Sequence, residues 1–503
     1  MRKRFIAIFL CCILLFGLAA CKPGDGADET EPSDLSGGEM TEQVLRLPYS
    51  KADSLNPFES KGLINRQLAL LLYDGLFRLD KTYKPAPLLA SGYTMEGREL
   101  TVTLADAVFS DGSRVRAEDV VASFQLAKKS EVYGQRLLNI SSVVASGNRV
   151  TFKLLSPDPH AAACLDFAVV RTQGNNLPMG SGRYVYLEGR EGVTLERNTR
   201  RQDFNPAIPS IALTDVTDSA SLLSAIAIGN ISFAYNELSS GQYQRINAST
   251  VETSLNNLVY LAFNSGRSAV ARPAFRRAVA LLLGRDELVL TAFQGHARAA
   301  ATPFNPDWYA LAGLDEAVIP STSATTDKSA VAELLAEAGY SQYKLQNTSF
   351  SLLANADNPF KRQAADQLAV QLAKGGMNVK VRALAFKEYE AAVRAGSYDF
   401  YLGEVKLSGN MSLTPLLGPG GAVGFGIDPE CDAAYAYGLF LKGDLDLQGF
   451  LDAFTEDPPL LPLCYRNAVA GYARSLQTPR VGCDGDIFCD IDRWMFAGQS
   501  PAE

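Results

Sequence analysis

Histidine is scarce in this chain, which has two among its 503 residues. His160 and His296 stand in unrelated settings, without a helical histidine pair or a Cys-x-x-Cys spacing, so no catalytic zinc is expected. The sequence also lacks a G-x-S-x-G nucleophile elbow, a P-loop and a dinucleotide-binding fingerprint. These absences predict a binding protein that is not an enzyme and holds no metal or cofactor.

Long hydrophobic runs are missing as well, apart from one near the N-terminus. That run covers residues 5–16, follows three basic residues and is too short to span a membrane, so it has the layout of an export signal. It closes on Leu18-Ala19-Ala20-Cys21, which resembles the lipobox of bacterial lipoproteins. The resemblance implies that Cys21 carries more than one acyl chain, as stable anchoring requires. An ordinary cleavage site with a coincidental cysteine is the alternative.

Acidic residues outnumber basic residues in this chain. Removal of Arg2, Lys3 and Arg4 with the signal leaves 44 basic against 55 acidic residues, a formal charge of −11. Nucleic acid is therefore not an expected partner. Residues 22–42 hold seven acidic residues and one lysine with almost nothing apolar, which predicts a disordered tether. About 460 residues remain beyond it, enough for two or three lobes.

Five cysteines remain if Cys11 and Cys12 leave with the signal and Cys21 is lipidated: Cys164, Cys431, Cys464, Cys483 and Cys489. Because five is odd, at least one stays unpaired. Cys483 and Cys489 are close enough in sequence to close a small loop by a disulfide in an oxidising compartment. The alternative is that both remain free thiols.

Two patterns of secondary structure divide the chain. In the first part, alternation predicts strands over 100–104 and 150–154, and Glu118 and Asp119 mark the first turn of a helix, which together indicate an α+β lobe. In the second part, one helix begins at Pro273 and stops at Gly284, and another ends at Gly339.

A regular alternation follows. It predicts a strand over 349–353, a helix over 359–374, a strand over 378–384, a helix over 387–394 and a strand over 398–402. This order is typical of βαβ units and a parallel sheet. Because such sheets bind ligands beyond the carboxyl ends of their strands, the turns near Asn355 and the run 402–426 are candidate binding segments.

Several motifs, in order along the chain, resemble the extracellular solute-binding family 5 of ABC importers. They are Ser54-Leu55-Asn56-Pro57, Leu72-Tyr73-Asp74-Gly75-Leu76, Phe109-Ser110-Asp111-Gly112 with Ala117-Glu118-Asp119-Val120-Val121, Gly180-Ser181-Gly182-Arg183-Tyr184, Leu261-Ala262-Phe263-Asn264, Arg276-Arg277-Ala278-Val279, and Leu334 to Tyr340. In the fourth motif, Arg183 replaces the family's usual proline. The resemblance covers almost all of the chain beyond the tether.

The resemblance implies an α/β fold of the two-lobed periplasmic-binding-protein type (type II) with an extra α+β domain. The expected division is a signal peptide (1–20), a tether (21–43), lobe I (44–73, 176–266 and 473–503), the extra domain (74–175) and lobe II (267–472).

The resemblance also implies a ligand site. In peptide-binding members the ligand's backbone pairs with two segments, which align here with Lys61, Gly62 and Leu63 and with Gly403, Glu404 and Val405. Wall positions align with Asn236, Tyr260 and Phe386. Packing within a lobe, or a place in a surface loop, is the alternative role for each of these residues.

The chain departs from the family just past this strand. Peptide-binding relatives place a tryptophan and then an aspartate there, and the carboxylate holds the ligand's ammonium. This sequence has Glu404-Val405-Lys406-Leu407-Ser408 instead. Glu404 is expected to supply the carboxylate through a charge-assisted bond, unless Lys406 neutralises it.

The expected function is that of a substrate-binding lipoprotein on the extracytoplasmic face of the bacterial membrane, which captures peptides or peptide-like solutes by hinge closure. Its expected partners are the solute and an ABC permease with its ATPase, and the protein is expected to be a monomer. The alternatives are a surface sensor on the same scaffold without transport, and a non-peptide cargo such as an oligosaccharide or a metal chelate.

Overall fold

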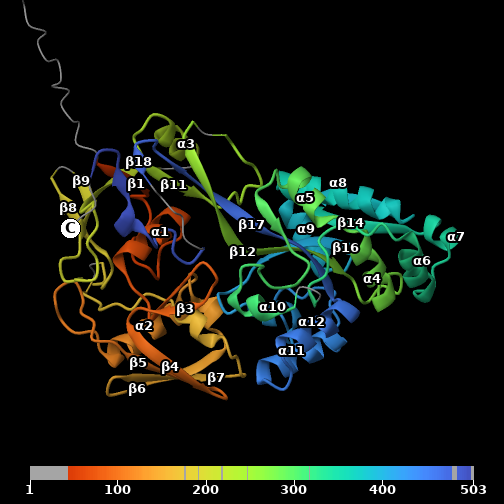
Figure 1. The fold of residues 1–503 in the computed structure, drawn as a ribbon, viewed down its shortest axis with the longest axis horizontal. Coiled ribbons are helices and arrows are strands. Elements are labelled where there is room, and N and C mark those ends of the chain that lie inside the picture. Colours follow the sequence, from red (N-terminus) through yellow and green to blue (C-terminus); the bar gives the residue numbers. More distant parts are fainter. Residues whose placement is uncertain are drawn as a thin grey trace, which may run out of the picture. The chain divides into compact units, whose positions relative to one another are not determined.

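A mixed seven-stranded sheet is the largest sheet of the computed structural model, which describes residues 44–174, 177–190, 192–216, 219–245, 247–315, 318–477 and 484–499. Its strand order is β11-β17-β12-β16-β14-β15, and β13 also pairs with β17. Figure 1 labels β11, β17, β12, β16 and β14. The strands are β11 (Phe233–Asn236), β12 (Ser249–Phe263), β13 (Ala297–Ala299), β14 (Ser349–Asn355), β15 (Asn378–Leu384), β16 (Phe400–Lys406) and β17 (Leu460–Tyr472).

The predicted alternation of strands and helices is confirmed. It consists of β14, α8 (Pro359–Lys374), β15, α9 (Phe386–Arg394) and β16. Strand β14 runs parallel to both β15 and β16. The last strand begins and ends later than predicted, at Lys406 rather than at residue 402, because the neighbouring β12 supplies pairing partners along its whole length.

Helices cover this sheet in two groups. The first group contains α4 (Pro273–Leu282), α5 (Arg285–Ala292), α6 (Lys328–Glu337), α7 (Gln342–Gln346) and α8. The second contains α9, α10 (Thr414–Leu417), α11 (Asp432–Lys442), α12 (Leu447–Glu456) and the 3-10 helix η3 (Tyr309–Gly313). Each group has its own buried core, centred on Phe275 and Phe400 in the first and on Trp308 and Phe450 in the second. The predicted helices at Pro273 and before Gly339 are confirmed as α4 and α6.

A four-stranded sheet of order β1-β10-β9-β8 forms a separate layer. Its strands are β1 (Leu45–Tyr49), β8 (Tyr184–Gly189), β9 (Gly192–Arg197) and β10 (Ser210–Asp215). Its core also takes side chains from α1 (Leu63–Leu72), from β11 and from the C-terminal segment, which contains β18 (Leu476–Gln477), η5 (Ile491–Arg493) and β19 (Met495–Phe496). Helix α3 (Ser219–Ala227) lies next to β11.

An antiparallel sheet of order β4-β5-β7-β6 carries α2 (Ala117–Lys129) on one face (Figure 1). Its strands are β4 (Ala90–Glu96), β5 (Glu99–Leu104), β6 (Ile140–Ser146) and β7 (Arg149–Leu154). The same stretch of chain also contains β2 (Phe77–Leu79), β3 (Pro85–Pro87) and the 3-10 helices η1 (Gly134–Leu137) and η2 (Ala161–Cys164). The predicted strands at 100–104 and 150–154 are confirmed. The predicted helix is also confirmed, and the Asp119 carboxylate accepts the Arg116 N–H at 2.8 Å where it begins.

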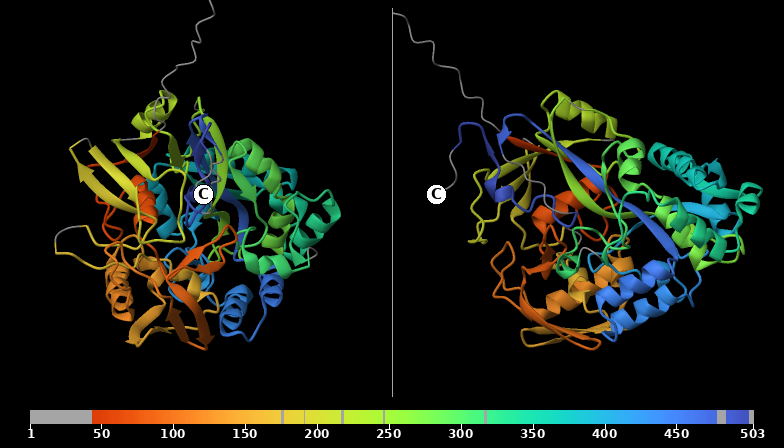
Figure 2. Two further views of the ribbon diagram at one scale, coloured as in Figure 1. Left: turned by 60° about the vertical axis from the view of Figure 1, so that its left-hand side comes forward. Right: turned by 45° about the vertical axis from the view of Figure 1, so that its right-hand side comes forward.

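Two long strands connect the cores. β12 contributes Leu255 to the core of the four-stranded sheet and Leu258 and Val259 to the two cores of the seven-stranded sheet. β17 pairs with β12, and Figure 2 shows β17 as a long blue strand. It contributes side chains to more than one core in the same way. The register between them shifts between Ser254 and Leu258, a β-bulge that falls where the strands leave one core for the next.

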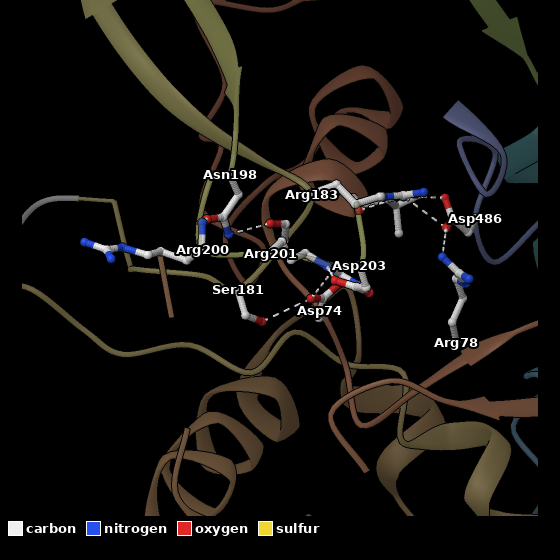
Figure 3. A network of polar contacts seen from close by, with 11 residues as sticks. Asp74, Arg78, Ser181, Arg183, Asn198, Arg200, Arg201, Asp203 and Asp486 are labelled. Carbon is white, nitrogen blue, oxygen red and sulfur yellow. Dashed lines mark hydrogen bonds and ion pairs between the residues drawn. The ribbon is translucent and has the colours of Figure 1, made fainter. Parts of the chain in front are cut away.

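A buried polar network holds the Gly180–Tyr184 turn (Figure 3). A Cβ at Gly182 would lie 2.3 Å from the carbonyl carbon of Leu72, so only glycine fits there. Arg183, at the family's proline position, donates from Nη2 to both carboxylate oxygens of Asp486 at 3.0 Å and also to the Leu70 carbonyl. Arg183 therefore fastens the C-terminal segment to α1.

Several predictions concern residues outside the described ones: the signal, Cys21 and the tether in 1–43, and Cys483. Cys489 is exposed and forms no disulfide with any residue that the structure describes. In the same part of the chain, none of the helices has the length and apolar character needed to cross a bilayer.

Candidate binding site at the end of strand β16

Strand β16 has an unpaired edge. On one side β12 pairs with it along residues 400–406. On the other side β14 pairs only with Phe400 and Tyr401. Among the described residues, no strand therefore lies against 402–406 on that side. Such an edge can accept an extended ligand as an added strand.

Position 403 in β16 is a glycine because Tyr260 leaves no room for a side chain there. A Cβ at Gly403 would lie 2.4 Å from Cζ of Tyr260, its partner across the β12–β16 pair. Tyr260 is buried and its hydroxyl lies 3.4 Å from that of Tyr401. Burial raises the pKa of Tyr260 to about 12. The ring of Tyr260 is therefore covered in this structure and packs under β16.

Glu404 is a largely buried carboxylate, with 11% of its side chain exposed, and three donors hold it. Its Oε1 accepts from Asn257 Nδ2 at 2.8 Å and from Arg466 Nε at 2.7 Å, and its Oε2 lies 2.9 Å from Lys361 Nζ. Burial by itself would raise the pKa of Glu404, but the charges of Lys361 and Arg466 outweigh burial and lower it to about 2. Glu404 is therefore ionised and already paired at neutral pH.

Lys406 does not neutralise Glu404, contrary to the alternative considered from the sequence. Its Nζ lies 2.9 Å from Asp484 and 3.3 Å from Glu237. Asp484 belongs to the C-terminal segment, and it also accepts the N–H of Asn256 in the β12 bulge. Lys406 therefore ties the end of β16 to the C-terminal segment.

Two backbone N–H groups of the segment 61–63 already have hydrogen-bond partners within the protein. The N–H groups of Lys61 and Gly62 donate to the Asp53 carboxylate, at 3.0 Å and 2.8 Å, and Leu63 begins α1. These hydrogen bonds lower the pKa of Asp53, although its burial acts the other way. The two amide groups expected to meet a ligand are thus occupied by Asp53 in this structure.

The remaining predicted positions are Asn236 and Phe386, and only Asn236 lies next to residues that contact the Glu404 network. Asn236 ends β11, and the carbonyls of the next two residues, Glu237 and Leu238, accept from Arg466 Nη1. Phe386 begins α9 with 53% of its surface exposed. The structure thus brings Gly403–Val405 and the loop after Asn236 together around Arg466, whereas no described hydrogen bond or ion pair joins Phe386 or segment 61–63 to Glu404.

Sequence reasoning missed Lys361, Arg466 and Asn257. One signal for Arg466 was available, because it interrupts the apolar run of β17, and a buried arginine in a strand needs a carboxylate partner. Lys361 carried no such signal, since lysine in the first turn of an amphipathic helix is ordinary. Within the described residues, no group of three or more His, Cys, Asp and Glu side chains could hold a metal ion.

Comparison with known proteins identifies the family. The family model described as "Bacterial extracellular solute-binding proteins, family 5 Middle" matches residues 84–415. A curated relative, the glutathione-binding protein GsiB of Salmonella typhimurium, is 25% identical over 401 residues, which are 73% of this chain and 76% of the relative.

Solved structures share the fold. The periplasmic murein tripeptide-binding protein MppA, in its unliganded open form, gives a TM-score of 0.71 at 19% identity, with 87% of this chain and 94% of that chain covered. A nickel ABC transporter protein from Bacillus halodurans gives 0.70 at 20% identity, with 87% and 96% covered. These likenesses confirm the predicted type II periplasmic-binding-protein fold. The chain belongs to the bacterial extracellular solute-binding proteins, family 5, and its role is to bind a substrate.

Proposed function

We propose that this chain captures a peptide-like solute along the free edge of β16 and delivers it to an ABC permease and its ATPase. The observation that carries the proposal is the stretch 402–406, which has no strand partner on one side; the Leu402 carbonyl accepts from the Tyr389 hydroxyl, and the backbone groups beyond it are offered to an extended ligand. The names of two relatives point to the same chemistry, since GsiB binds glutathione and MppA a murein tripeptide, whereas the Bacillus halodurans protein is named for nickel. The cargo is released chemically unchanged.

Closure of two lobes around the cargo completes the proposal. Lobe I comprises 44–73, 176–266 and 473–503, lobe II comprises 267–472, and 74–175 form the extra domain. The β12 bulge supplies a hinge, because the paired strands β12 and β17 run from the core of the four-stranded sheet into the cores of the seven-stranded sheet. Contacts from both lobes to one solute favour the closed form by the difference in affinity between the two forms.

The protein acts outside the cytoplasm as a lipid-anchored monomer. Cys21 holds the lipid, and residues 22–43 form the tether that gives the folded part reach from the membrane. The resemblance of Leu18-Ala19-Ala20-Cys21 to a lipobox supports this part of the proposal.

Small-angle X-ray scattering tests the proposal on the chain with Cys21→Ser, which removes the lipid. Native mass spectrometry first identifies any co-purified solute, and a tri- to hexapeptide library serves where none is found. We expect the radius of gyration to fall on saturation. An unchanged radius with bound peptide would contradict hinge closure, and the absence of any captured peptide would contradict the proposed cargo.

A further inference from the structure

Six charged side chains meet at the end of β16 in equal numbers of each sign. Lys361 and Arg466 pair with Glu404, and Glu237 and Asp484 pair with Lys406; the four pairs span 2.7 to 3.3 Å. Glu404 and Lys406 are two residues apart on one strand, so both side chains project from the same face. The group as a whole is therefore neutral.

Lys361 pairs with Glu404, the carboxylate that the family resemblance assigns to a ligand's amino terminus. It is the first-turn lysine of α8, the helix that follows β14, and its ammonium reaches Glu404 Oε2 at 2.9 Å. The other oxygen, Oε1, is already shared by Arg466 and Asn257. A ligand ammonium could gain a strong bond from Glu404 only by displacing Lys361, which would then lose its own partner.

A ligand carboxylate meets only cations that already have a carboxylate partner, and for Lys361 that partner is Glu404. Arg466 donates from Nε to Glu404 and from Nη1 to the carbonyls of Glu237 and Leu238, and only 6% of its side chain is exposed. Lys406 is bound by two carboxylates. Neither sign of charge at the end of a cargo therefore finds an unused counter-charge in this group.

From this charge balance we infer that the end of the cargo next to Glu404 is uncharged, as in an N-acylated or cyclic peptide-like solute, with Lys361 acting as an internal substitute for the ligand's ammonium. The inference rests on the proposed peptide-like cargo. Lys361 and Glu404 are then specificity-determining residues that exclude free amino termini.

The test uses two matched probes, a tri- to hexapeptide library with free amino termini and the same library after N-acetylation. Both are offered together to the full chain in detergent, and the captured peptides are quantified by mass spectrometry. The wild-type chain should enrich the acetylated library at least about tenfold, the effect expected for one hydrogen bond to a charged group.

Three variants sharpen the test. Lys361→Met leaves the six charged residues with one excess negative charge. The ratio of captured acetylated peptides to captured free-amine peptides should then shift at least about tenfold toward the free amines. The double variant Lys361→Met/Glu404→Gln restores neutrality and should restore the wild-type ratio, which a merely structural role for Lys361 would not do. Lys374→Met, at the far end of the same helix, is the control and should leave the ratio unchanged; circular dichroism confirms folding.

The outcomes separate the two proposals. Enrichment of the free-amine library by the wild-type chain, or a ratio that Lys361→Met does not move, overturns the inference and leaves the peptide-like cargo standing. Capture of neither library by the wild-type chain overturns the peptide-like cargo itself and, with it, this inference.

Discussion

Two carboxylates of this protein, the buried Asp486 and the largely buried Glu404, are each held by two cations, yet their surroundings differ. Asp486 bonds to Arg183 through both oxygens, with a second arginine, Arg78, at 3.6 Å, and Arg183 and Asp486 have 6% and 3% of their side chains exposed (Figure 3). Glu404 lies on a strand with an unpaired edge, and one of its cations, Lys361, has 18% of its side chain exposed.

The difference shows that a charge cluster alone does not identify a binding site. The Arg183 and Asp486 side chains are almost fully closed to solvent, so the energy of the Asp486 network stabilises the fold. The Glu404 network lies beside backbone groups without a strand partner and includes a partly accessible lysine. The first network should therefore govern stability, and the second should govern which solute is bound.

Arg183→Leu should have the largest effect on stability. It leaves Asp486 buried with only the more distant Arg78 and should lower the free energy of unfolding by about 3–5 kcal/mol. Denaturant unfolding at neutral pH measures this loss. Arg394→Leu, which breaks an exposed pair with Glu390, is the control and should cost less than about 1 kcal/mol. Equal losses in both variants would remove the distinction between the networks.

Glu404→Gln should change the acid sensitivity of the fold. The pKa of Glu404 is lowered to about 2, so its charge stabilises the folded state above the pKa of the unfolded chain, and this contribution is lost as the pH falls from about 4.5 to about 2. Unfolding measured from pH 6 to pH 2 should show the wild type losing about 3 kcal/mol relative to the variant. Glu390→Gln, on an exposed helix surface, is the control, and its free energy of unfolding should depend on pH as that of the wild type does. The same pH dependence in Glu404→Gln and the wild type would refute the lowered pKa.

Lys361→Met should have the smallest effect on stability. Glu404 keeps Arg466 and Asn257, so we expect a loss of about 1–2 kcal/mol in the free energy of unfolding. Its effect on the choice between free and acetylated peptides should nevertheless exceed that of Arg183→Leu. A stability loss as large as that of Arg183→Leu would place both networks in the same structural role.

Much of the fold was predictable because local patterns agreed with tertiary structure. The helix 359–374 and the strand 378–384 have the predicted bounds, since Pro359 opens the helix and regular alternation defines the strand. The end of β16 was predicted too early, because its last residues depend on pairing with β12, more than 130 residues away in sequence.

The candidate site was only partly predictable. Gly403 and Glu404 were found through resemblance, but the partners of Glu404 come from α8, β12 and β17, and no local pattern brings these together. The role of Asp53 was missed for the same reason, since its carboxylate reaches forward along the chain to the amides at 61 and 62. Likewise, Arg183 stands where the family usually has proline, and its role is evident only from its contact with Asp486, near the other end of the chain.

Hydrogen–deuterium exchange with and without bound peptide tests the central claim most directly. Peptic fragments that cover 402–406 should exchange more slowly when a captured peptide saturates the protein, because the peptide adds a strand to the free edge of β16. Fragments from β4 to β7 should exchange at the same rate in both states. Bound peptide without any slowing at 402–406 would contradict the account.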